Sequence, residues 1–182
     1  MKSKWLVPGV IAAVVVLLVM ILGGTYNGLV TSREKVTKAA SDLQSQYQRR
    51  SDLVQQAIGI VKGSSEFEQS TLTQVVEARA KATSTQIDIS SATPEQIQQF
   101  QSAQNNMSGA FSRLLVSVEQ YPDIKSTQAY QDMLTQVEGT ENRVNVARTD
   151  YNEVARSYNT QIQRFPTNII ACLLYTSPSP RD

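Results

Sequence analysis

The chain has 182 residues, a length that allows one domain of ordinary size beyond an apolar N-terminal segment. Its 17 basic and 16 acidic residues give a net charge of +1, which provides no long-range field for attracting nucleic acid. We therefore expect no nucleic-acid partner. His is absent and Cys172 is the single cysteine, so a disulfide framework is excluded and transition-metal ligands are scarce. We expect neither a metal ion nor another cofactor.

Residues 6–24 form an uncharged segment rich in Val, Leu, Ile, Ala and Met, long enough to cross the ~30 Å hydrocarbon core of a membrane. Trp5 and Tyr26 flank it, at the positions that aromatic side chains favour in the two membrane interfaces. The basic N-terminus also admits a cleaved signal peptide. However, the apolar run exceeds the usual signal-peptide core of roughly 7 to 15 residues, and no Ala-x-Ala-like site follows. We predict an uncleaved transmembrane anchor over residues 1–25.

The orientation of the anchor depends on the basic residues at its two ends. Lys2 and Lys4 precede the span, whereas Arg33, Lys35 and Lys38 follow it at a greater distance. Basic residues close to a span favour the cytoplasmic side. We therefore expect a single-pass protein whose soluble domain lies outside the cytoplasm.

Beyond the span, apolar residues recur at steps of three, four or seven, the period of one helical face. The first such stretch covers residues 26–62 and is expected to end at Gly63 in a left-handed C-cap. Ser65 and Glu68 match a Ser-x-x-Glu capping box for a second helix, which should end before Ser90.

A third helix is predicted to begin at Thr93, with Pro94 in its first turn and Gln96 as the partner in a second capping box. Its apolar seam is broken only by Gln104, and it should end before Pro122. A fourth helix follows over residues 127–165, and no segment alternates with the period of a strand. Short connections make consecutive helices antiparallel. The sequence thus predicts an all-α fold, a long antiparallel bundle of four helices, up-down-up-down, after the transmembrane helix.

Two charged residues interrupt the apolar seams of the first and last bundle helices. If Tyr26 lies opposite Phe165, antiparallel partners have residue numbers that add up to about 191, as those of Arg50 and Glu141 do. We predict that Arg50 and Glu141 form an ion pair. The alternative is that each side chain extends along the seam to reach solvent, as long charged side chains often do.

A second ion pair is predicted on the same register. Arg148 also lies on the seam of the last helix, and it should come within reach of Asp42. Such pairs add little net stability, but they penalise wrong registers, because removing one partner strands the other charge.

Three Asn residues, each directly after a Tyr, gather near the membrane end of the expected bundle. Asn152 and Asn159 are seven residues apart and so share one helix face, and the register places Asn27 nearby. They could contact a protein partner or lipid headgroups. Hydrogen bonding between helices inside the bundle is the favoured interpretation, because buried polar groups are nearly always hydrogen-bonded.

Several spaced motifs, in the same order, resemble the LemA family of bacterial membrane proteins. They are Tyr26-Asn27-x-Leu29-Val30, Arg49-Arg50-x-Asp52-Leu53, Val61-Lys62-Gly63, Val76-Glu77-Ala78-Arg79-Ala80, Glu141-Asn142-Arg143 with Ala147-Arg148-x-x-Tyr151-Asn152, Tyr158-Asn159 and Phe165-Pro166. The resemblance implies a membrane-anchored helical bundle in the bacterial inner membrane, and it implies no catalytic residues.

The resemblance runs from the anchor to about Ala171, so residues 26–171 are expected to form the LemA-like bundle domain. Members of the family usually continue with a tail that contains Gly and Phe. Residues 172–182 instead resemble translated sequencing-adapter read-through, and we predict that they are not native.

No pattern in the sequence indicates catalysis. The acidic pairs Glu66 with Glu68 and Glu138 with Glu141 have no His nearby, so the Glu-x-x-His repeats of a di-iron bundle are missing. A Gly-x-Ser-x-Gly nucleophile motif and a phosphate-binding Gly-rich loop are also missing. We do not expect an enzyme.

Two functions remain. The first is a membrane-anchored scaffold or adaptor that acts through protein–protein contacts, with the lipid bilayer, other membrane or envelope proteins and copies of itself as partners. The second is a signal-transducing or sensory rod that binds a ligand or partner at the membrane. Transduction needs a segment on the far side of the membrane, and only residues 1–4 precede the span. The scaffold is therefore favoured.

Overall fold

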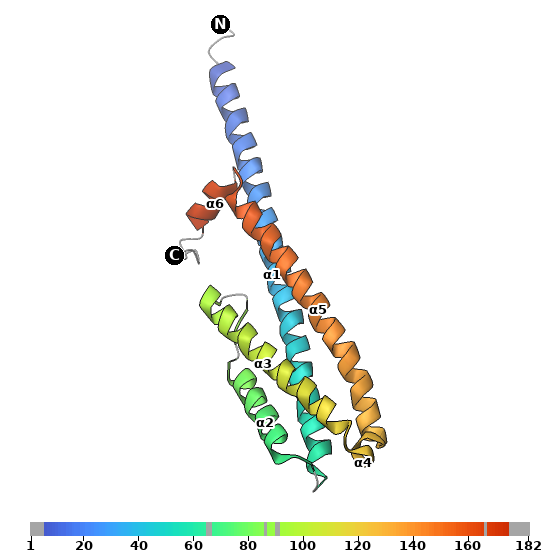
Figure 1. The fold of residues 1–182 in the computed structure, drawn as a ribbon. Coiled ribbons are helices and arrows are strands. Elements are labelled where there is room, and N and C mark those ends of the chain that lie inside the picture. The colour runs from blue at the N-terminus through green and yellow to red at the C-terminus, as the bar shows by residue number, and fades with distance from the viewer. Residues whose placement is uncertain (1–5, 65–66, 86, 90–91, 166, 175–182) are drawn as a thin grey trace. The chain divides into compact units, whose positions relative to one another are not determined.

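The computed structural model describes residues 6–64, 67–85, 87–89, 92–165 and 167–174. Over these ranges the chain forms helices and no strand, so the predicted all-α fold is confirmed (Figure 1). The helices are α1 (Leu6–Lys62), α2 (Gln69–Ser84), α3 (Pro94–Val118), α4 (Pro122–Lys125), α5 (Gln128–Gln163) and α6 (Thr167–Leu174).

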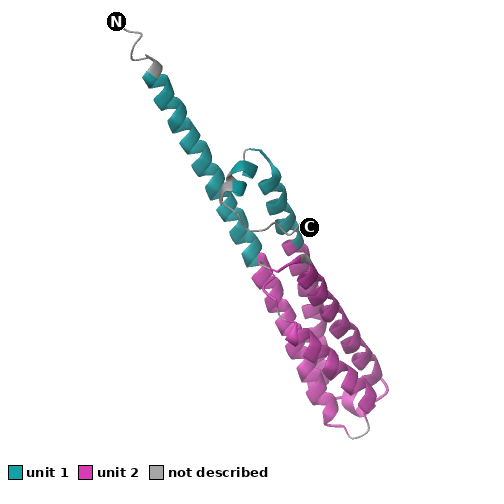
Figure 2. Cartoon of the chain, turned by 90° about the vertical axis from the view of Figure 1, so that its left-hand side faces the viewer, with its two compact units in different colours: residues 1–38, 152–181 teal, residues 39–151, 182 magenta. Residues whose placement is uncertain are grey.

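The chain divides into two compact units, shown in Figure 2. Unit 1 comprises residues 1–38 and 152–181, and unit 2 comprises residues 39–151 together with residue 182. Helices α1 and α5 each contribute residues to both units.

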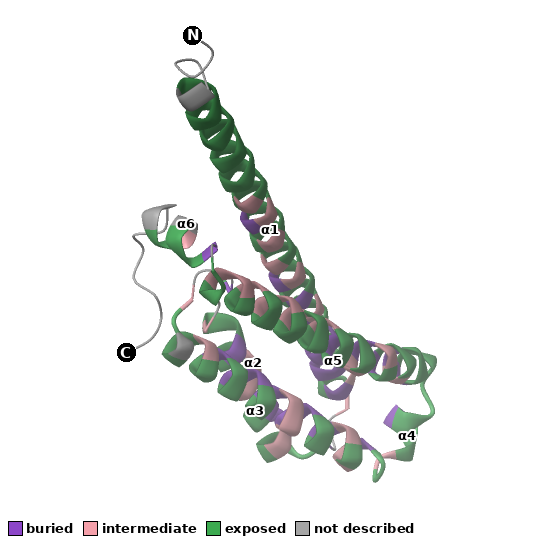
Figure 3. Ribbon diagram, turned by 90° about the horizontal axis from the view of Figure 1, so that it is seen from above, coloured by how far each residue is buried: buried purple, intermediate pink, exposed green. Residues whose placement is uncertain are grey.

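Unit 1 contains the segment predicted to cross the membrane. The large apolar side chains between Val10 and Leu22 are 45–65% exposed, and Figure 3 shows this stretch of α1 as exposed. No residue of its most apolar stretch is buried. Among the described residues, α1 is the one helix that is long and apolar enough to span a bilayer. An apolar surface of this extent is stable only in a lipid environment or against a partner, so its exposure agrees with a single-pass anchor.

Unit 2 holds the hydrophobic core of the bundle. Its long helices follow one another in alternating directions, and α2 lies beside α3 (Figure 1). The largest core cluster draws on α1, α2, α3, α4 and α5, and it includes the fully buried Val54, Met107 and Leu114. A second cluster contains Leu43, Tyr47, Phe100 and their neighbours. The helices are thus held together mainly by apolar seams, as the three- and four-residue spacing predicts.

The predicted start of α3 is confirmed. The backbone N–H of Gln96 donates to Thr93 Oγ1 (3.3 Å), and the backbone N–H of Thr93 donates to Gln96 Oε1 (2.9 Å). This reciprocal capping box satisfies two N–H groups that the first turn of a helix leaves without partners.

Two predicted helix ends are wrong in detail. Gly63 does not adopt a left-handed backbone; instead its N–H donates to the carbonyl of Ile60 (3.3 Å), which closes α1 with a tighter turn. Ser65 lies outside the described residues, and α2 begins only at Gln69. The carboxylate of Glu68 accepts hydrogen bonds from the hydroxyls of Ser70 (2.5 Å) and Thr71 (3.1 Å), which lower the pKa of Glu68.

Two short helices were not predicted from the sequence. Helix α4 is a single turn that buries Ile124, and one turn is too short to show a periodic pattern. Helix α6 follows the predicted stop at Pro166, a residue outside the described part of the chain. In addition, α1 runs without interruption from Leu6 to Lys62, so the anchor and the first bundle helix are one element.

Candidate functional site

A buried polar cluster in unit 2 is centred on Arg50 of α1, whose side chain is only 6% exposed. Arg50 Nη1 lies 3.5 Å from Glu141 Oε2 on α5. Arg50 Nη2 donates to both the side-chain Oε1 (2.9 Å) and the backbone carbonyl (3.3 Å) of Gln104 on α3. The structure thus brings together Arg50 and Glu141, the pair derived from the register, and adds Gln104. The interruption of the α3 seam by Gln104 was the signal for this third residue.

Aromatic rings pack around the guanidinium group of Arg50. The ring of Tyr47 lies 5.2 Å from Arg50 Cζ, a cation–π distance, and meets Phe100 edge to face with centroids 5.2 Å apart. Burial raises the pKa of Tyr47, while the positive charges of Arg50 and Arg148 partly oppose this effect. Tyr47 therefore remains a neutral phenol at physiological pH.

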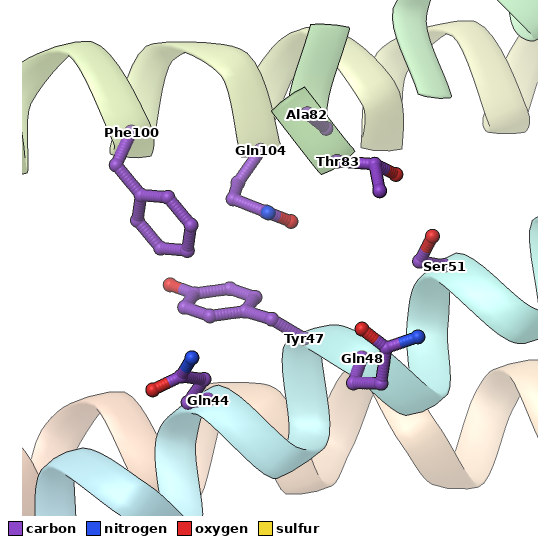
Figure 4. Close-up of a pocket in the computed structure, with 8 residues that line it drawn as sticks. All are labelled: Gln44, Tyr47, Gln48, Ser51, Ala82, Thr83, Phe100 and Gln104. Carbon is purple, nitrogen blue, oxygen red and sulfur yellow. The ribbon is translucent and has the colours of Figure 1, made fainter. Parts of the chain in front are cut away.

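A small cavity of about 40 Å³ adjoins this cluster (Figure 4). Its lining residues come from α1, α2 and α3 and are Gln44, Tyr47, Gln48, Ser51, Ala82, Thr83, Phe100 and Gln104. Ser51 is 7% exposed, and within the described structure its hydroxyl has no hydrogen-bond partner. One water needs roughly 10–15 Å³ of such volume, so the cavity can hold a few waters or a very small polar group.

The second predicted ion pair is wrong. Arg148 is exposed and donates to Asn145 Oδ1 (3.3 Å) on its own helix, and it forms no ion pair with Asp42. Asp42 instead lines a groove of about 280 Å³ between α1 and α5. The other residues that line this groove, called here the α1/α5 groove, are Ala39, Gln46, Arg143, Val146, Ala147 and Asp150.

The three Asn residues lie in unit 1, and their side chains are exposed. Their exposure disfavours hydrogen bonding inside the bundle, and both that interpretation and a contact with lipid or with a partner stay predictions. The inter-helix bond found in this region is different: the Ser32 hydroxyl on α1 donates to Gln161 Oε1 on α5 (2.6 Å). Neither residue stood out in the sequence, because both are common polar types on mixed helix faces.

The chemistry available in the cluster is hydrogen bonding and ion pairing. Among the described residues, no three His, Cys, Asp or Glu side chains gather where they could hold a metal ion. Glu66 lies outside the described residues, and Glu138 is an exposed residue of α5. Arg50, Gln104 and Glu141 join three helices at one height, so the cluster sets how these helices align.

Comparisons with known proteins agree with the resemblance seen in the motifs. A sequence model of the LemA family matches residues 39–181. Protein LemA of Metamycoplasma hominis is 27% identical over 148 residues, which cover 81% of this chain and 64% of the relative.

Two magnetosome proteins share a shorter segment with the chain. Magnetosome protein MamQ 2 of Paramagnetospirillum magneticum is 39% identical over 69 residues, 38% of this chain and 25% of the relative. Magnetosome protein MamQ of Magnetospirillum gryphiswaldense is 32% identical over 71 residues, 39% of this chain and 26% of the relative. The chain thus spans less than two thirds of the length of each of these relatives. Because the family match extends over most of its residues, the chain belongs to the LemA family.

Proposed function

We propose that the protein is a membrane-anchored scaffold or adaptor that acts through protein–protein contacts. One observation carries this proposal: α1 is a single helix that contains both an exposed apolar segment and residues of the bundle core. Tethering at a bilayer raises the effective concentration of a binding domain towards other membrane proteins. The anchor should therefore matter to function as much as the bundle does.

The α1/α5 groove in unit 2 is the surface that best suits a protein partner. Its lining combines the apolar Ala39, Ala147 and exposed Val146 with the charged Asp42, Arg143 and Asp150. A groove lined by both apolar and charged side chains suits an amphipathic helix, whose apolar side chains contact the apolar lining while its polar side chains pair with the charged residues. The partner is another membrane or envelope protein or a second copy of this chain.

Anchor deletion tests the scaffold. Removing residues 1–25 should abolish activity in cells while the helical content of the remaining domain is retained. If the soluble fragment restored activity to a deletion strain, tethering would be unnecessary and the proposal would fail.

Site-specific cross-linking tests the groove. A photoreactive residue at Ala147 should give a discrete cross-linked product in membranes, whereas one at the exposed Val116 of α3 should give much less. The added variant Val146→Glu should reduce the product from Ala147. Equal products from both positions would show that the groove is not the contact surface.

For location, we propose the inner membrane with the soluble domain outside the cytoplasm. The protein should remain in the pellet when membranes are washed with carbonate. A phosphatase fused after Ala171 should be active only if the domain has been exported, and an inactive fusion that is present at normal levels would reverse the orientation.

A signal-transducing rod is the second candidate, and the uninterrupted α1 favours it, because one helix could carry a shift between the bundle and the membrane. Replacing residues 8–22 with an unrelated apolar span of the same length separates the two functions. A scaffold needs only attachment and should tolerate the exchange, whereas a transducer that depends on the sequence of its span should lose activity.

A further inference from the structure

The turn after α5 and the start of α6 carry an apolar surface that the bundle does not cover. Phe165 is 80% exposed and Ile169 is 50% exposed, and both belong to unit 1, as the anchor segment does. Helix α6, with the sequence TNIIACLL, contains no charged residue. An exposed Phe next to an uncharged apolar helix is unfavourable in water, so this surface requires an apolar neighbour.

Contacts between α1 and α5 show which residues of α1 lie beside the last turns of α5. Gln161 accepts the hydrogen bond of Ser32 (2.6 Å), and a Cβ atom at Gly28 would lie 3.5 Å from Gln161 Nε2. Gln161 therefore faces the turn of α1 between residues 28 and 32. Helix α5 ends two residues later, at Gln163, and Phe165 lies in the turn that follows it. Because α5 runs antiparallel to α1 in Figure 1, this turn lies beyond Gln161 on the side of Tyr26 and the anchor segment.

Tyr26 lies two residues beyond the apolar segment of residues 6–24 and is 47% exposed. Exposed aromatic side chains near the end of an apolar span match the aromatic belt of a membrane interface. Tight turns hold the start of α6 close to the end of α5: the N–H of Arg164 donates to the Gln161 carbonyl (3.3 Å), and that of Asn168 donates to the Arg164 carbonyl (2.8 Å). Helix α6 then leaves the direction of α5 (Figure 1).

We propose that Phe165 and α6 form a second membrane contact, in which the short helix lies in the lipid interface beside the point where α1 leaves the bilayer. This inference rests on the proposed anchorage of α1 and adds a contact that the anchor does not need. The occupant of the apolar surface is lipid, because Gln161, which closely precedes this surface in the chain, contacts α1 only a few residues beyond the end of the apolar span. Phe165 and Ile169 both precede residue 172, where the predicted non-native tail begins.

Fluorescence of the full chain in phosphatidylcholine vesicles tests this contact. Trp5 is the single Trp, so a Trp5→Phe background allows one new Trp at a time. Interfacial helices insert their apolar face about 5–10 Å below the headgroup level, so lipids spin-labelled near the top of the acyl chain should cause about a twofold loss of emission from Phe165→Trp. Labels near the end of the acyl chain should quench it less. Val116→Trp, on an exposed face of unit 2, is the matched control and should not be quenched.

Two further variants separate the possible failures. Val15→Trp lies within the apolar span and should be quenched most by labels near the end of the acyl chain. If Val15→Trp is quenched and Phe165→Trp is not, the anchor stands and the second contact is refuted; if neither is quenched, the anchorage itself fails. Adding Ile169→Glu should reduce the quenching of Phe165→Trp. If the emission of Phe165→Trp shifted to the blue as the protein-to-lipid ratio rose, but was not quenched by the labelled lipids, the surface would contact another copy of the chain. That result would overturn the proposal.

Discussion

Replacing Arg50 or Glu141 should destabilise the bundle by unequal amounts, because the two side chains differ in exposure. Arg50 is almost fully buried, whereas the side chain of Glu141 is 36% exposed. Arg50 also donates two hydrogen bonds to Gln104, and its Nε has no partner among the described residues. Removing Glu141 leaves the buried charge of Arg50 with only the neutral acceptors of Gln104. Removing Arg50 leaves the carboxylate of Glu141, which water can reach.

The structure sets the magnitudes. Breaking a fully buried pair costs ~3–5 kcal/mol, but the 3.5 Å separation and the exposure of Glu141 reduce this, so Glu141→Leu should cost about 1–2 kcal/mol. Arg50→Met also removes the hydrogen bonds to Gln104, and an unsatisfied buried acceptor costs ~1–3 kcal/mol. We therefore expect about 2–3 kcal/mol for Arg50→Met. The double variant should lose about 1–2 kcal/mol less than the sum of the single losses, because neither charge is then left alone.

Denaturation of the detergent-solubilised full chain, followed by circular dichroism, measures these losses through a double-mutant cycle. Glu119→Gln is the matched control, because it removes the exposed ion pair with Lys125 and should cost no more than ~1 kcal/mol. Strictly additive losses for Arg50 and Glu141 would refute the coupling. A loss for Glu141→Leu as small as that of the control would show that Gln104 alone satisfies the guanidinium.

Three further predictions concern stability. Burial raises the pKa of Tyr47 above its ordinary value of 10.0, so the stability that neutral Tyr47 contributes is complete below pH 10 and is lost as pH rises through the raised pKa. The unfolding free energy should therefore fall between pH 9 and 11.5, and Tyr47→Phe should make this fall less steep. Thr93→Ala removes the N-cap of α3 and should cost about 0.5–2 kcal/mol in denaturant unfolding, whereas Thr93→Ser should cost little. Met107→Ala, at a fully buried position, should cost about 2–5 kcal/mol, and a loss below 1 kcal/mol would show that the core is loosely packed there.

The sequence alone was sufficient for the features that depend on local chemistry. The apolar period predicted the long helices, and the capping box at Thr93 predicted the start of α3, because both signals arise from residues a few positions apart. The apolar run of residues 6–24 predicted the span for the same reason. The register of α1 against α5 could also be estimated, since matched helix lengths and a fixed rise per residue restrict it, and the structure brings Arg50 within 3.5 Å of Glu141.

The tertiary structure decided what each polar side chain contacts. Register places residues at one height, but it does not fix the rotamer or the neighbour on a third helix, so Gln104 could not be named as the acceptor for Arg50. Arg148 bonds to Asn145 because an exposed guanidinium on a helix readily finds a partner three residues away on the same helix. The exposure of Phe165 likewise depends on where α5 ends against α1 and on how the chain turns into α6. These contacts join residues far apart in the chain, and only the packing of the helices determines which of them meet.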